Sequence, residues 1–456
     1  MTTIAVIGAG PAGLSICKEL LATSQTKCGD WEKPVVFESR AGVGGIWVPD
    51  AEPHQHPQTP LYNSLTTNLP HPVMSFQCFP FPPSTPVFPS AKHVQSYLEE
   101  FASHFDLMAC IRFGEKVISL HWDSTQWILT SSKACYRFDR VVVANGHHSV
   151  PRIPDIPGVQ AWLDANVASH SIWYRKPSHL GDKVLVIGGG PSGNDISAEL
   201  SSCCITLIRS YTGAPNEEHG NVKTRGRTVK LGEAGRVEFA DGTVETDVDY
   251  CILATGYKVD IPFLQLATGI PPACPPLPSV LYNSSYHLFP LARHLFPIQT
   301  EFPPSTLAFM GLPVRVAPLP VMEAQAAAII KVFAEPSSLD IDAESQMILK
   351  RYQTLDTACN GDHTAVARLW SIFDEDQQFK YQDELFRFAG SSNTVPQWRK
   401  DMYSAKALLR AFWVELERRG EAEEWVRDVE GMDAWVAVMQ RLLKKAREWN
   451  PQVKLP

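Results

Sequence analysis

The sequence predicts an α/β protein in which two similar strand–turn–helix units are followed by a helical C-terminal extension. The stretch "IAVIGAGPAGLSICKEL", which starts at Ile4, returns in register as "VLVIGGGPSGNDISAEL", which starts at Val184. Each copy runs from apolar residues through Gly-x-Gly-x-x-Gly into a helix-like segment, as a buried parallel strand does when it turns into a helix. After residue 337, apolar residues recur at three- and four-residue spacing, which predicts amphipathic helices.

Length and charge restrict the possible classes of protein. A chain of 456 residues is long enough for two or three domains. Its formal net charge of −8 argues against nucleic acid as a partner, because phosphate binding requires a basic face. The first strand starts by residue 4, which leaves no room for a signal peptide, and no apolar run has transmembrane length. We therefore expect a soluble, cytoplasmic protein that binds no membrane.

The first glycine-rich turn has the form of a phosphate-binding cradle. Gly8 permits the tight turn, Gly10 lets the backbone approach a pyrophosphate, and Gly13 lets the helix pack closely on the strand. The helix N-terminus then offers free N–H groups to the phosphates. The next strand, "PVVFES", ends in Glu38, which we expect to accept a hydrogen bond from a ribose hydroxyl; a loop insertion explains its late position. The residues assigned to this dinucleotide are Gly8, Ala9, Gly10, Pro11, Ala12, Gly13 and Glu38.

The second cradle has a different residue at the end of its second strand. Here "CITLIRS" ends in Arg209 and Ser210 where an acid is usual. An arginine at this place suits a 2′-phosphate, which indicates NADP(H) rather than NAD(H). The residues assigned to this second dinucleotide are Gly188, Gly190, Ser192, Gly193, Asn194, Asp195 and Arg209.

Matched closing strands indicate that the two units are nested, Rossmann-like domains. "RVVVANGHH" and "YCILATGY" are short strands that end in a glycine turn, and each follows a predicted hairpin. We place a first nucleotide-binding domain at residues 1–155, a second at residues 156–295, and the return to the first domain with the helical extension at residues 296–456.

The segment "YNSLTTNLPHPVMSFQCFPFP", residues 62–82, is too rich in proline for a regular helix or a central strand. Its many apolar side chains predict a loop packed against something large and flat, for which a flavin ring is the obvious candidate. The absence of Cys-x-x-Cys argues against the pyridine-nucleotide disulfide reductases. The chain resembles the class B flavin-containing monooxygenases over residues 1–335. This resemblance is carried by the 62–82 segment and by four further motifs: "GVGGIW", "LATGY", "STLAFMGL" and "VMEAQAAAIIKVFA".

This resemblance implies that the first domain binds FAD and the second binds NADPH. It implies a monooxygenase that uses O2, through a C4a-hydroperoxyflavin, to oxygenate a nitrogen or sulfur of a small soft nucleophile such as an amine or sulfide. Asn68 is then the expected catalytic residue, in contact with both cofactors. The resemblance also assigns cofactor contacts to Gly45, Ile46, Trp47, Thr67, Asn68, Leu69, Val117 and Gln325. It requires no metal, and a homodimer is the ordinary expectation.

The family's identifying motif is only half present. "HSIWY", His170 to Tyr174, matches its second half, but Asp164 and Asn166 replace the expected Phe and Gly. Related Baeyer–Villiger enzymes have Trp in place of Tyr174, so the ending favours heteroatom oxygenation. Whether His170 is functional or structural stays open. The alternatives are Baeyer–Villiger or hydroxylating chemistry at carbon and, in another class, an NADPH oxidase or a non-catalytic redox sensor. Metal binding by "HQHPQTP", residues 54–60, is disfavoured because a third ligand is lacking.

Overall fold

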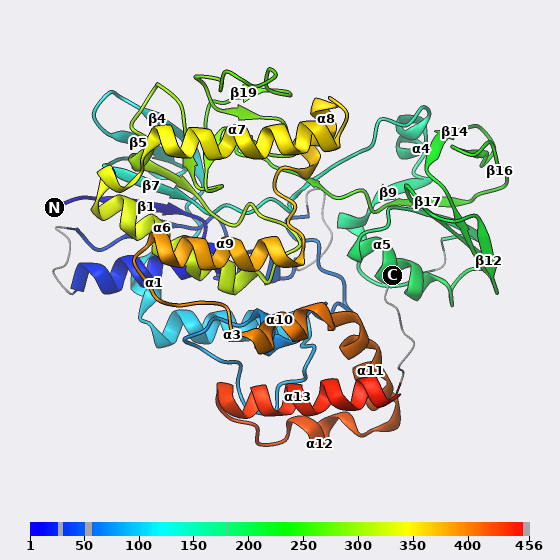
Figure 1. The fold of residues 1–456 in the computed structure, drawn as a ribbon. Coiled ribbons are helices and arrows are strands. Elements are labelled where there is room, and N and C mark those ends of the chain that lie inside the picture. The colour runs from blue at the N-terminus through cyan, green and yellow to red at the C-terminus, as the bar shows by residue number, and fades with distance from the viewer. Residues whose placement is uncertain (26–30, 51–56, 179, 450–456) are drawn as a thin grey trace. The chain divides into compact units, whose positions relative to one another are not determined.

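The fold is described from a computed structural model, in which residues 1–25, 31–50, 57–178 and 180–449 are placed well enough to describe. The chain divides into two compact units (Figure 1). The first contains the described residues of Met1–Val48, Thr66–Gly146 and Val259–Pro456. The second contains those of Pro49–Leu65 and His147–Lys258.

These units differ from the domains expected from sequence in two respects. The chain changes units after Gly146 and after Lys258, whereas the sequence suggested 155 and 295. The short segment Pro49–Leu65 also belongs to the second unit. It is held there by Arg175, which pairs with Asp50 at 3.1 Å and accepts a backbone bond from Asn63 at 2.7 Å. Residues 259–295 accordingly belong to the first unit.

A five-stranded parallel sheet forms the centre of the first unit. Its order is β24 (Leu307–Phe309), β7 (Arg140–Val143), β1 (Ile4–Ile7), β2 (Val35–Phe37) and β3 (Ile111–Arg112). All four residues of β1 are buried, as expected for a central strand of a parallel sheet. An antiparallel sheet of β4 (Val117–Trp122), β5 (Trp127–Ser131) and β6 (Cys135–Phe138) contains the predicted hairpin.

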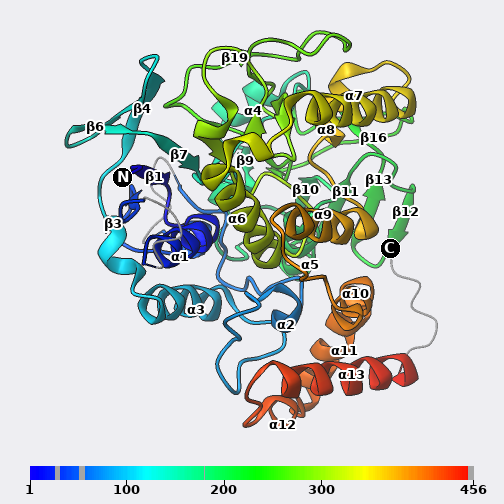
Figure 2. The same ribbon diagram turned by 60° about the vertical axis from the view of Figure 1, so that its left-hand side comes forward.

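Helices fill the remainder of the first unit. Helices α1 (Pro11–Gln25), α6 (Pro318–Ala334) and α9 (Glu375–Phe388) lie side by side, as Figure 2 shows. The others are α2 (His71–Met74), α3 (Ala91–His104), α7 (Ile341–Ala358), α8 (His363–Leu369), α10 (Gln397–Ser404), α11 (Lys406–Arg419), α12 (Ala422–Val426) and α13 (Met432–Trp449). Short strands β19 (Ala267–Thr268), β20 (Tyr282–Asn283), β21 (Leu288–Phe289), β22 (Leu291–Ala292) and β23 (Phe296–Pro297) complete it.

The second unit repeats the design with a six-stranded sheet. Its order is β12 (Glu217–His219), β13 (Val222–Arg225), β11 (Thr206–Ser210), β10 (Lys183–Ile187), β17 (Tyr250–Leu253) and β9 (Ala168–His170), and only the pairing of β12 is antiparallel. The smaller elements are β8 (Val150–Pro151), α4 (Val159–Asp164), α5 (Pro191–Leu200), β14 (Thr228–Leu231), β15 (Val237–Phe239), β16 (Val244–Glu245) and β18 (Tyr257–Lys258). Two Rossmann-like units in an α/β chain, as predicted, are therefore confirmed.

The C-terminal region confirms the predicted amphipathic helices. The apolar faces of α11 and α13 are buried, including Phe412, Trp413, Trp435 and Leu442. They form one core with apolar residues of the 62–90 region, among them Leu69, Val73, Met74, Val87 and Phe88. The extension is thus part of the first unit's core.

The proline-rich segment differs from its prediction in one turn. We expected no regular helix over residues 62–82, but α2 occupies His71–Met74. Pro70 is its N-cap and Pro72 stands within the first turn. Proline is tolerated there because the first backbone N–H groups of a helix have no partner within the helix.

Over the described part of the chain, no helix combines the length and the apolar character that a membrane crossing requires.

Candidate functional site

The first cradle has the close contacts that its glycines predict. A Cβ atom on Gly13 would lie 1.9 Å from the carbonyl oxygen of Gly8, and one on Gly8 would lie 2.5 Å from that of Ala144. Gly8 also has a φ of +104°, which a side chain would strain. Helix α1 begins at Pro11, where the lack of an N–H group costs nothing. Helix and strand therefore approach so closely that only glycine fits.

The segment "GVGGIW", whose Gly45, Ile46 and Trp47 the resemblance assigns to a cofactor, lies directly on this cradle. A Cβ on Gly45 would be 2.9 Å from the Cα of Gly10, and the Gly44 N–H donates to the Ala9 carbonyl at 3.0 Å. Gly45, Ile46 and Trp47 form one 3-10 turn. The Arg40 guanidinium donates to the Gly45 carbonyl at 3.2 Å. The backbone of this turn and that of the cradle are thus held as one surface.

Glu38 lies where the sequence placed it, at the end of β2 and against the cradle. Its side chain is 6% exposed, and Oε2 accepts a hydrogen bond from the Ala9 N–H at 2.8 Å. Oε1 accepts from the Arg40 N–H at 2.8 Å. Val117, at the start of β4, shares an apolar cluster with Ile7 and Phe37, the last residues of β1 and β2. Glu38 therefore contacts the cradle at Ala9, and Val117 packs beside the strands that lead into it.

Gln325 has its hydrogen-bonding groups engaged by the protein. It is fully buried in α6, where Oε1 accepts from the Gly311 N–H at 3.0 Å and Nε2 donates to the Tyr381 hydroxyl at 3.0 Å. Gly311 stands at a φ of +75° just after β24. In this chain Gln325 therefore fixes the turn after β24 and ties it to α9.

The second cradle repeats the steric design of the first. A Cβ on Gly193 would lie 2.0 Å from the Gly188 carbonyl, and one on Gly188 would lie 2.1 Å from that of Ala254. A Cβ on Gly190, in contrast, would meet nothing within 4 Å. Gly190 is exposed at the N-cap of α5, and Ser192 and Asn194 lie in the first turns of that helix. A ligand that approaches the backbone at Gly190 fits this open surface.

Arg209 and Asn194 lie together at the edge of the second cradle. Arg209 Nη2 donates to Asn194 Oδ1 at 2.6 Å, and its guanidinium lies 5.8 Å from the ring centre of Tyr211. Within the described ranges, no carboxylate of the chain lies within ion-pair distance of Arg209. Its charge is available to a phosphate, as the predicted NADP(H) preference requires.

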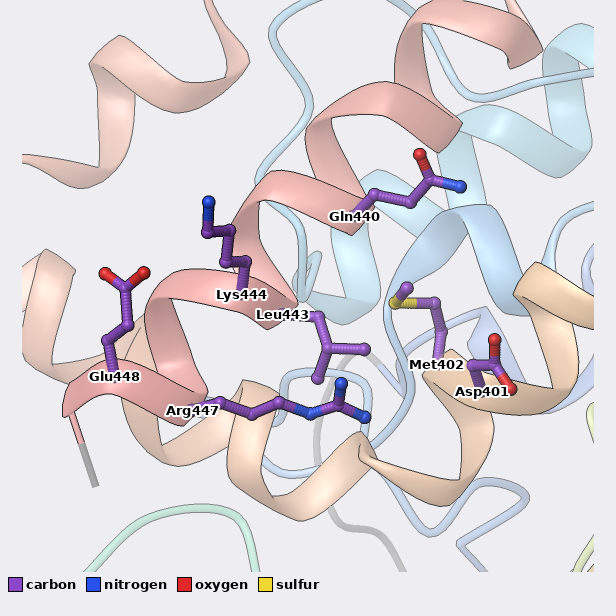
Figure 3. A pocket seen from close by; sticks show the side chains of 7 residues that line it. All are labelled: Asp401, Met402, Gln440, Leu443, Lys444, Arg447 and Glu448. Atoms are coloured by element: carbon purple, nitrogen blue, oxygen red, sulfur yellow. The ribbon is translucent and has the colours of Figure 1, made fainter. Parts of the chain in front are cut away.

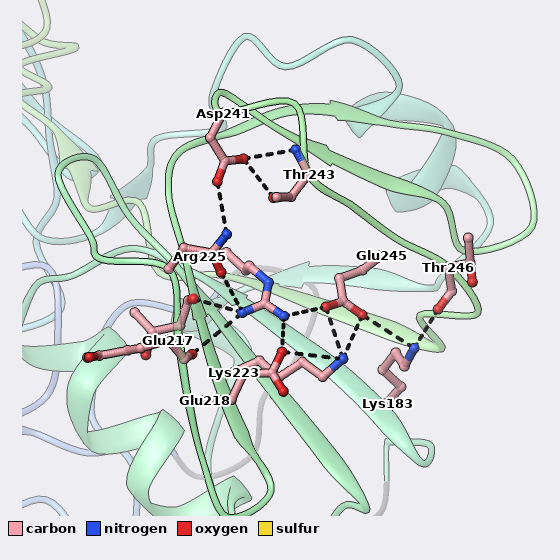
Figure 4. Close-up of polar contacts among 11 residues, drawn as sticks. Lys183, Glu217, Glu218, Lys223, Arg225, Asp241, Thr243, Glu245 and Thr246 are labelled. Atoms are coloured by element: carbon pink, nitrogen blue, oxygen red, sulfur yellow. Dashed lines mark hydrogen bonds and ion pairs between the residues drawn. The ribbon is translucent and has the colours of Figure 1, made fainter.

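Two other basic side chains of the second unit, Arg225 and Lys223, are paired with carboxylates of the protein. Arg225 bonds Glu245 at 2.8 Å and also bonds Glu218, while Lys223 bonds both oxygens of Glu245 at 3.1 and 3.2 Å (Figure 4). These charges hold the pKa of Glu245 below its usual range against the opposing effect of burial. Arg209 differs from these two residues in that it bonds an amide oxygen, that of Asn194.

Asn68 lies exposed on the 62–82 segment, between buried neighbours. Thr67 is 4% exposed and its Oγ1 donates to the Leu69 carbonyl at 2.8 Å. The Thr67 N–H donates to the Pro89 carbonyl at 2.9 Å. The Asn68 side chain makes no hydrogen bond within the described residues. Its amide is therefore presented outward by a fixed backbone.

Apolar side chains around Asn68 pack on α3 and on the C-terminal helices. Phe81 stacks on Tyr97 of α3 with ring centres 3.8 Å apart, and Phe76 lies 4.4 Å from Phe101. Leu69 and Met74 enter the core of the C-terminal helices. Part of the apolar surface of this loop is therefore buried by α3 and by the C-terminal helices, which are tertiary contacts that no local sequence pattern reveals.

Asp195 has a partner that sequence reasoning missed. Its carboxylate accepts a hydrogen bond from the Tyr62 hydroxyl, and one turn further along α5, Glu199 accepts bonds from Tyr174 at 2.5 Å and from Ser64. Burial and the carboxylate together raise the pKa of Tyr62 above its usual range. The acidic face of α5 therefore holds the 57–65 segment. The partners are 133 and 135 residues apart, so no spacing rule could have found them.

The open question about His170 has a structural answer. The residue is fully buried, Nδ1 accepts the Ile172 N–H at 3.1 Å, and Nε2–H donates to the Gly256 carbonyl at 3.0 Å. Burial lowers its pKa to about 4, so it is neutral at physiological pH. His170 links β9 to the "ATGY" turn and is a structural residue of the second unit.

An open hollow of about 460 Å³ lies between α10 and α13 (Figure 3). Asp401, Lys444, Arg447 and Glu448 are among its lining residues, and none of the cradle residues takes part. Across the described residues, no group of three or more His, Cys, Asp or Glu side chains could hold a metal ion. His54 and His56 lie outside the described residues.

The residues present fit the two expected cofactors. The Gly10–Gly45 surface with Glu38 suits the pyrophosphate and ribose of FAD, and the open backbone at Gly190 with Arg209 suits NADPH. The open backbone at Gly190 and the guanidinium donors of Arg209 belong to the chain itself, as do the Gly10–Gly45 surface and Glu38.

Comparison with known proteins gives the same answer. The model of the family "Flavin-binding monooxygenase-like" matches residues 1–214 and 214–390. "Flavin-containing monooxygenase FMO GS-OX-like 4" of Arabidopsis thaliana is 30% identical, over 92% of this chain and 94% of its own length. "Thiol-specific monooxygenase" of Saccharomyces cerevisiae is 30% identical, over 73% and 77%. The structure of S-allyl-L-cysteine S-oxygenase from Allium sativum superposes with a TM-score of 0.75 at 25% identity, covering 98% of both chains.

The two cradles fit a flavin dinucleotide and a nicotinamide dinucleotide. The family match indicates the same two cofactors. The chain belongs to the flavin-binding monooxygenase family and is an FAD- and NADPH-dependent monooxygenase.

Proposed function

We propose that this enzyme oxygenates the sulfur of a small thioether or thiol. In this reaction one oxygen atom of O2 forms a bond to sulfur, the other leaves as water, and NADPH supplies the two electrons. When bound, flavin reduced by NADPH would activate O2 and pass one of its oxygen atoms to the sulfur. The relatives support sulfur over nitrogen, since one is named for thiols and one for the sulfur of S-allyl-L-cysteine. The single observation that carries the proposal is that both of these relatives are named for sulfur compounds, while this chain keeps both glycine-rich cradles.

Each compact unit has its own proposed part in this function. The first unit holds FAD through Gly8, Gly10, Gly13, Glu38 and the Gly45–Trp47 turn, with Val117 and Gln325 supporting the site. The second unit holds NADPH through Gly188, Gly190, Ser192, Gly193, Asn194 and Arg209. Support for both assignments comes from the close glycine contacts and from the Arg209–Asn194 pair. In this assignment, Asp195 acts indirectly by holding Tyr62.

Asn68 is the proposed catalytic residue. Its outward amide, on a backbone fixed by Thr67 and flanked by buried residues, is suited to donate a hydrogen bond to the reacting oxygen or to orient the nicotinamide. No acid–base side chain is needed for attack by a soft sulfur nucleophile, so orientation and the exclusion of water are the protein's main contributions.

Competition between substrates tests the choice of sulfur. With NADPH and O2, an S-alkyl cysteine and a tertiary amine of similar size are supplied together, and sulfoxide and N-oxide are quantified. We expect kcat/KM for the thioether to exceed that for the amine by about tenfold or more, as a site shaped for one heteroatom would give. Faster N-oxide formation would assign the enzyme to amines. Ester from an added ketone would assign it to Baeyer–Villiger chemistry, and peroxide alone would favour an NADPH oxidase.

We also propose that the enzyme is cytoplasmic and that it acts on its small-molecule substrate as a homodimer. Cell fractionation and light scattering of the purified holoenzyme test these two points directly.

A further inference from the structure

The position of Asn68 depends on its backbone, because its own side chain has no hydrogen-bond partner among the described residues. Two backbone bonds hold that stretch against residues 87–90: Thr67 N–H to the Pro89 carbonyl at 2.9 Å and His71 N–H to the Val87 carbonyl at 2.8 Å. Thr66 and Ser90 add an antiparallel bridge. We call these two segments, residues 66–71 and 87–90, the ribbon, although they form no regular strands. Whatever supports the ribbon determines where Asn68 points.

The C-terminal helices support the ribbon at both ends. On one side, Arg410 of α11 donates from Nη2 to the Thr66 hydroxyl, two residues before Asn68. Its guanidinium also lies 5.1 Å from the ring centre of Phe88 on the opposite segment of the ribbon. A single side chain of α11 therefore contacts both segments.

On the other side, the support comes from α13. The ring of His71, three residues after Asn68, meets the ring of Trp435 edge to face, with centres 4.2 Å apart and planes at 85°. Trp435 is fully buried and His71 is 1% exposed, so this contact lies in the core that α11 and α13 share with Leu69. Contacts of this kind transmit displacement of one element to the other.

We propose that α11 and α13 form a brace that positions the Asn68 loop, with Arg410 as its principal positioning residue. The inference rests on the proposed role of Asn68. The brace comprises Arg410 and Trp435, both beyond residue 390, where the match to the family model ends. A part of the chain outside that match thereby controls the geometry of the oxygenation site.

A double-mutant cycle tests the brace in the FAD-bound full-length enzyme. The variants are Arg410→Met, which removes the donor, Thr66→Val, which removes the acceptor at equal shape, and their combination. Arg418→Met on the same helix is the matched control, because its exposed side chain pairs with Glu415 and, among the described residues, with no part of the ribbon. Amide hydrogen exchange is followed in peptides covering residues 62–71, without substrate, so the readout is independent of turnover.

Arg410→Met and Thr66→Val are each expected to speed exchange in that region by about tenfold, as loss of one charge-assisted hydrogen bond implies. The double variant should be no faster than the faster single variant, and Arg418→Met should match the wild type. Unchanged exchange in the single variants, or additive effects in the double variant, would overturn the brace.

Product formed per NADPH consumed distinguishes positioning from a merely structural contact. Arg410→Met should lower this ratio while FAD content and the rate of flavin reduction stay unchanged, and Arg410→Lys should restore part of it. A faster-exchanging loop with wild-type coupling would overturn the positioning role. If the wild type itself forms no S-oxygenated product, the proposed function fails, whereas the exchange data still decide whether the brace exists.

Discussion

Two polar side chains, Arg209 and Asn68, carry the proposed recognition and chemistry. Arg209 has a defined partner, Asn194, and no carboxylate of the described chain within ion-pair distance, so its charge is available to a ligand. Asn68 is exposed and unbonded within those residues, and its role rests on its place in the loop and on the family. Each can be tested by a substitution that leaves the fold unchanged.

Asn68→Ala and Asn68→Asp are expected to retain FAD and to be reduced by NADPH at the wild-type rate. Product formed per NADPH consumed should fall by about tenfold or more, because the loss of a donor at a developing charge is costly. Asn63→Ala, at another exposed position on the neighbouring stretch, is the control and should couple normally. Full coupling in both Asn68 variants would remove Asn68 from the mechanism.

Arg209→Gln is expected to raise KM for NADPH by between about ten- and a hundredfold, since a charge-assisted contact to the 2′-phosphate is lost. KM for NADH, which lacks that phosphate, should stay as in the wild type and so provides an internal control. Steady-state flavin reduction with both nucleotides gives the ratio. An unchanged preference for NADPH would mean that another group recognises the phosphate.

At the scale of elements, the strand–turn–helix cradles were the most predictable parts of the molecule. Their requirements are local: Gly13 and Gly193 are required by carbonyls only five residues earlier in the chain. The hairpins β5–β6 and β15–β16 were predictable for the same reason. The attachment of the 57–65 segment to α5 by Tyr62 and the packing of the 62–82 loop were not, because their partners lie far away in sequence.

Substitutions at Gly193 and Gly190 of the second cradle should separate effects on stability from effects on nucleotide binding. Gly193→Ala places a methyl group 2.0 Å from the Gly188 carbonyl and should destabilise the second unit. Gly190→Ala meets nothing within 4 Å, and Gly190 has an ordinary φ of −79°, so the melting temperature should stay within about 2 °C of the wild type. Its Kd for NADP⁺ should nevertheless rise by about tenfold, which corresponds to about 1.4 kcal/mol of lost close approach. Tight binding by Gly190→Ala would show that the nucleotide does not approach this backbone.

At the scale of the whole molecule, buried histidines make stability depend on pH. Burial lowers the pKa of four histidines. The pKa falls to about 3 for His71, His287 and His294, and to about 4 for His170. The unfolded chain binds protons at these positions below about pH 6.5, while the folded chain does not. Stability should therefore fall as the pH drops from 7 to 5, by about 2 kcal/mol per residue at pH 5.

His71→Leu tests this dependence at a fully buried position whose ring packs edge to face on Trp435. The slope of melting temperature against pH between 7 and 5 should become shallower than in the wild type, whatever the absolute stability. His121→Leu, at an exposed position, is the control and should keep the wild-type slope. Equal slopes in all three proteins would show that His71 does not contribute to acid destabilisation.

The proposed oxygenation requires FAD and NADPH to act together on O2, and isotope-labelled O2 tests this requirement directly. The holoenzyme is supplied with NADPH, ¹⁸O2 and an S-alkyl cysteine, and NADPH oxidised, labelled sulfoxide and hydrogen peroxide are quantified together. We expect one ¹⁸O atom in the sulfoxide for each NADPH consumed, with little peroxide. Stoichiometric peroxide without labelled product, across thioethers and thiols, would contradict it.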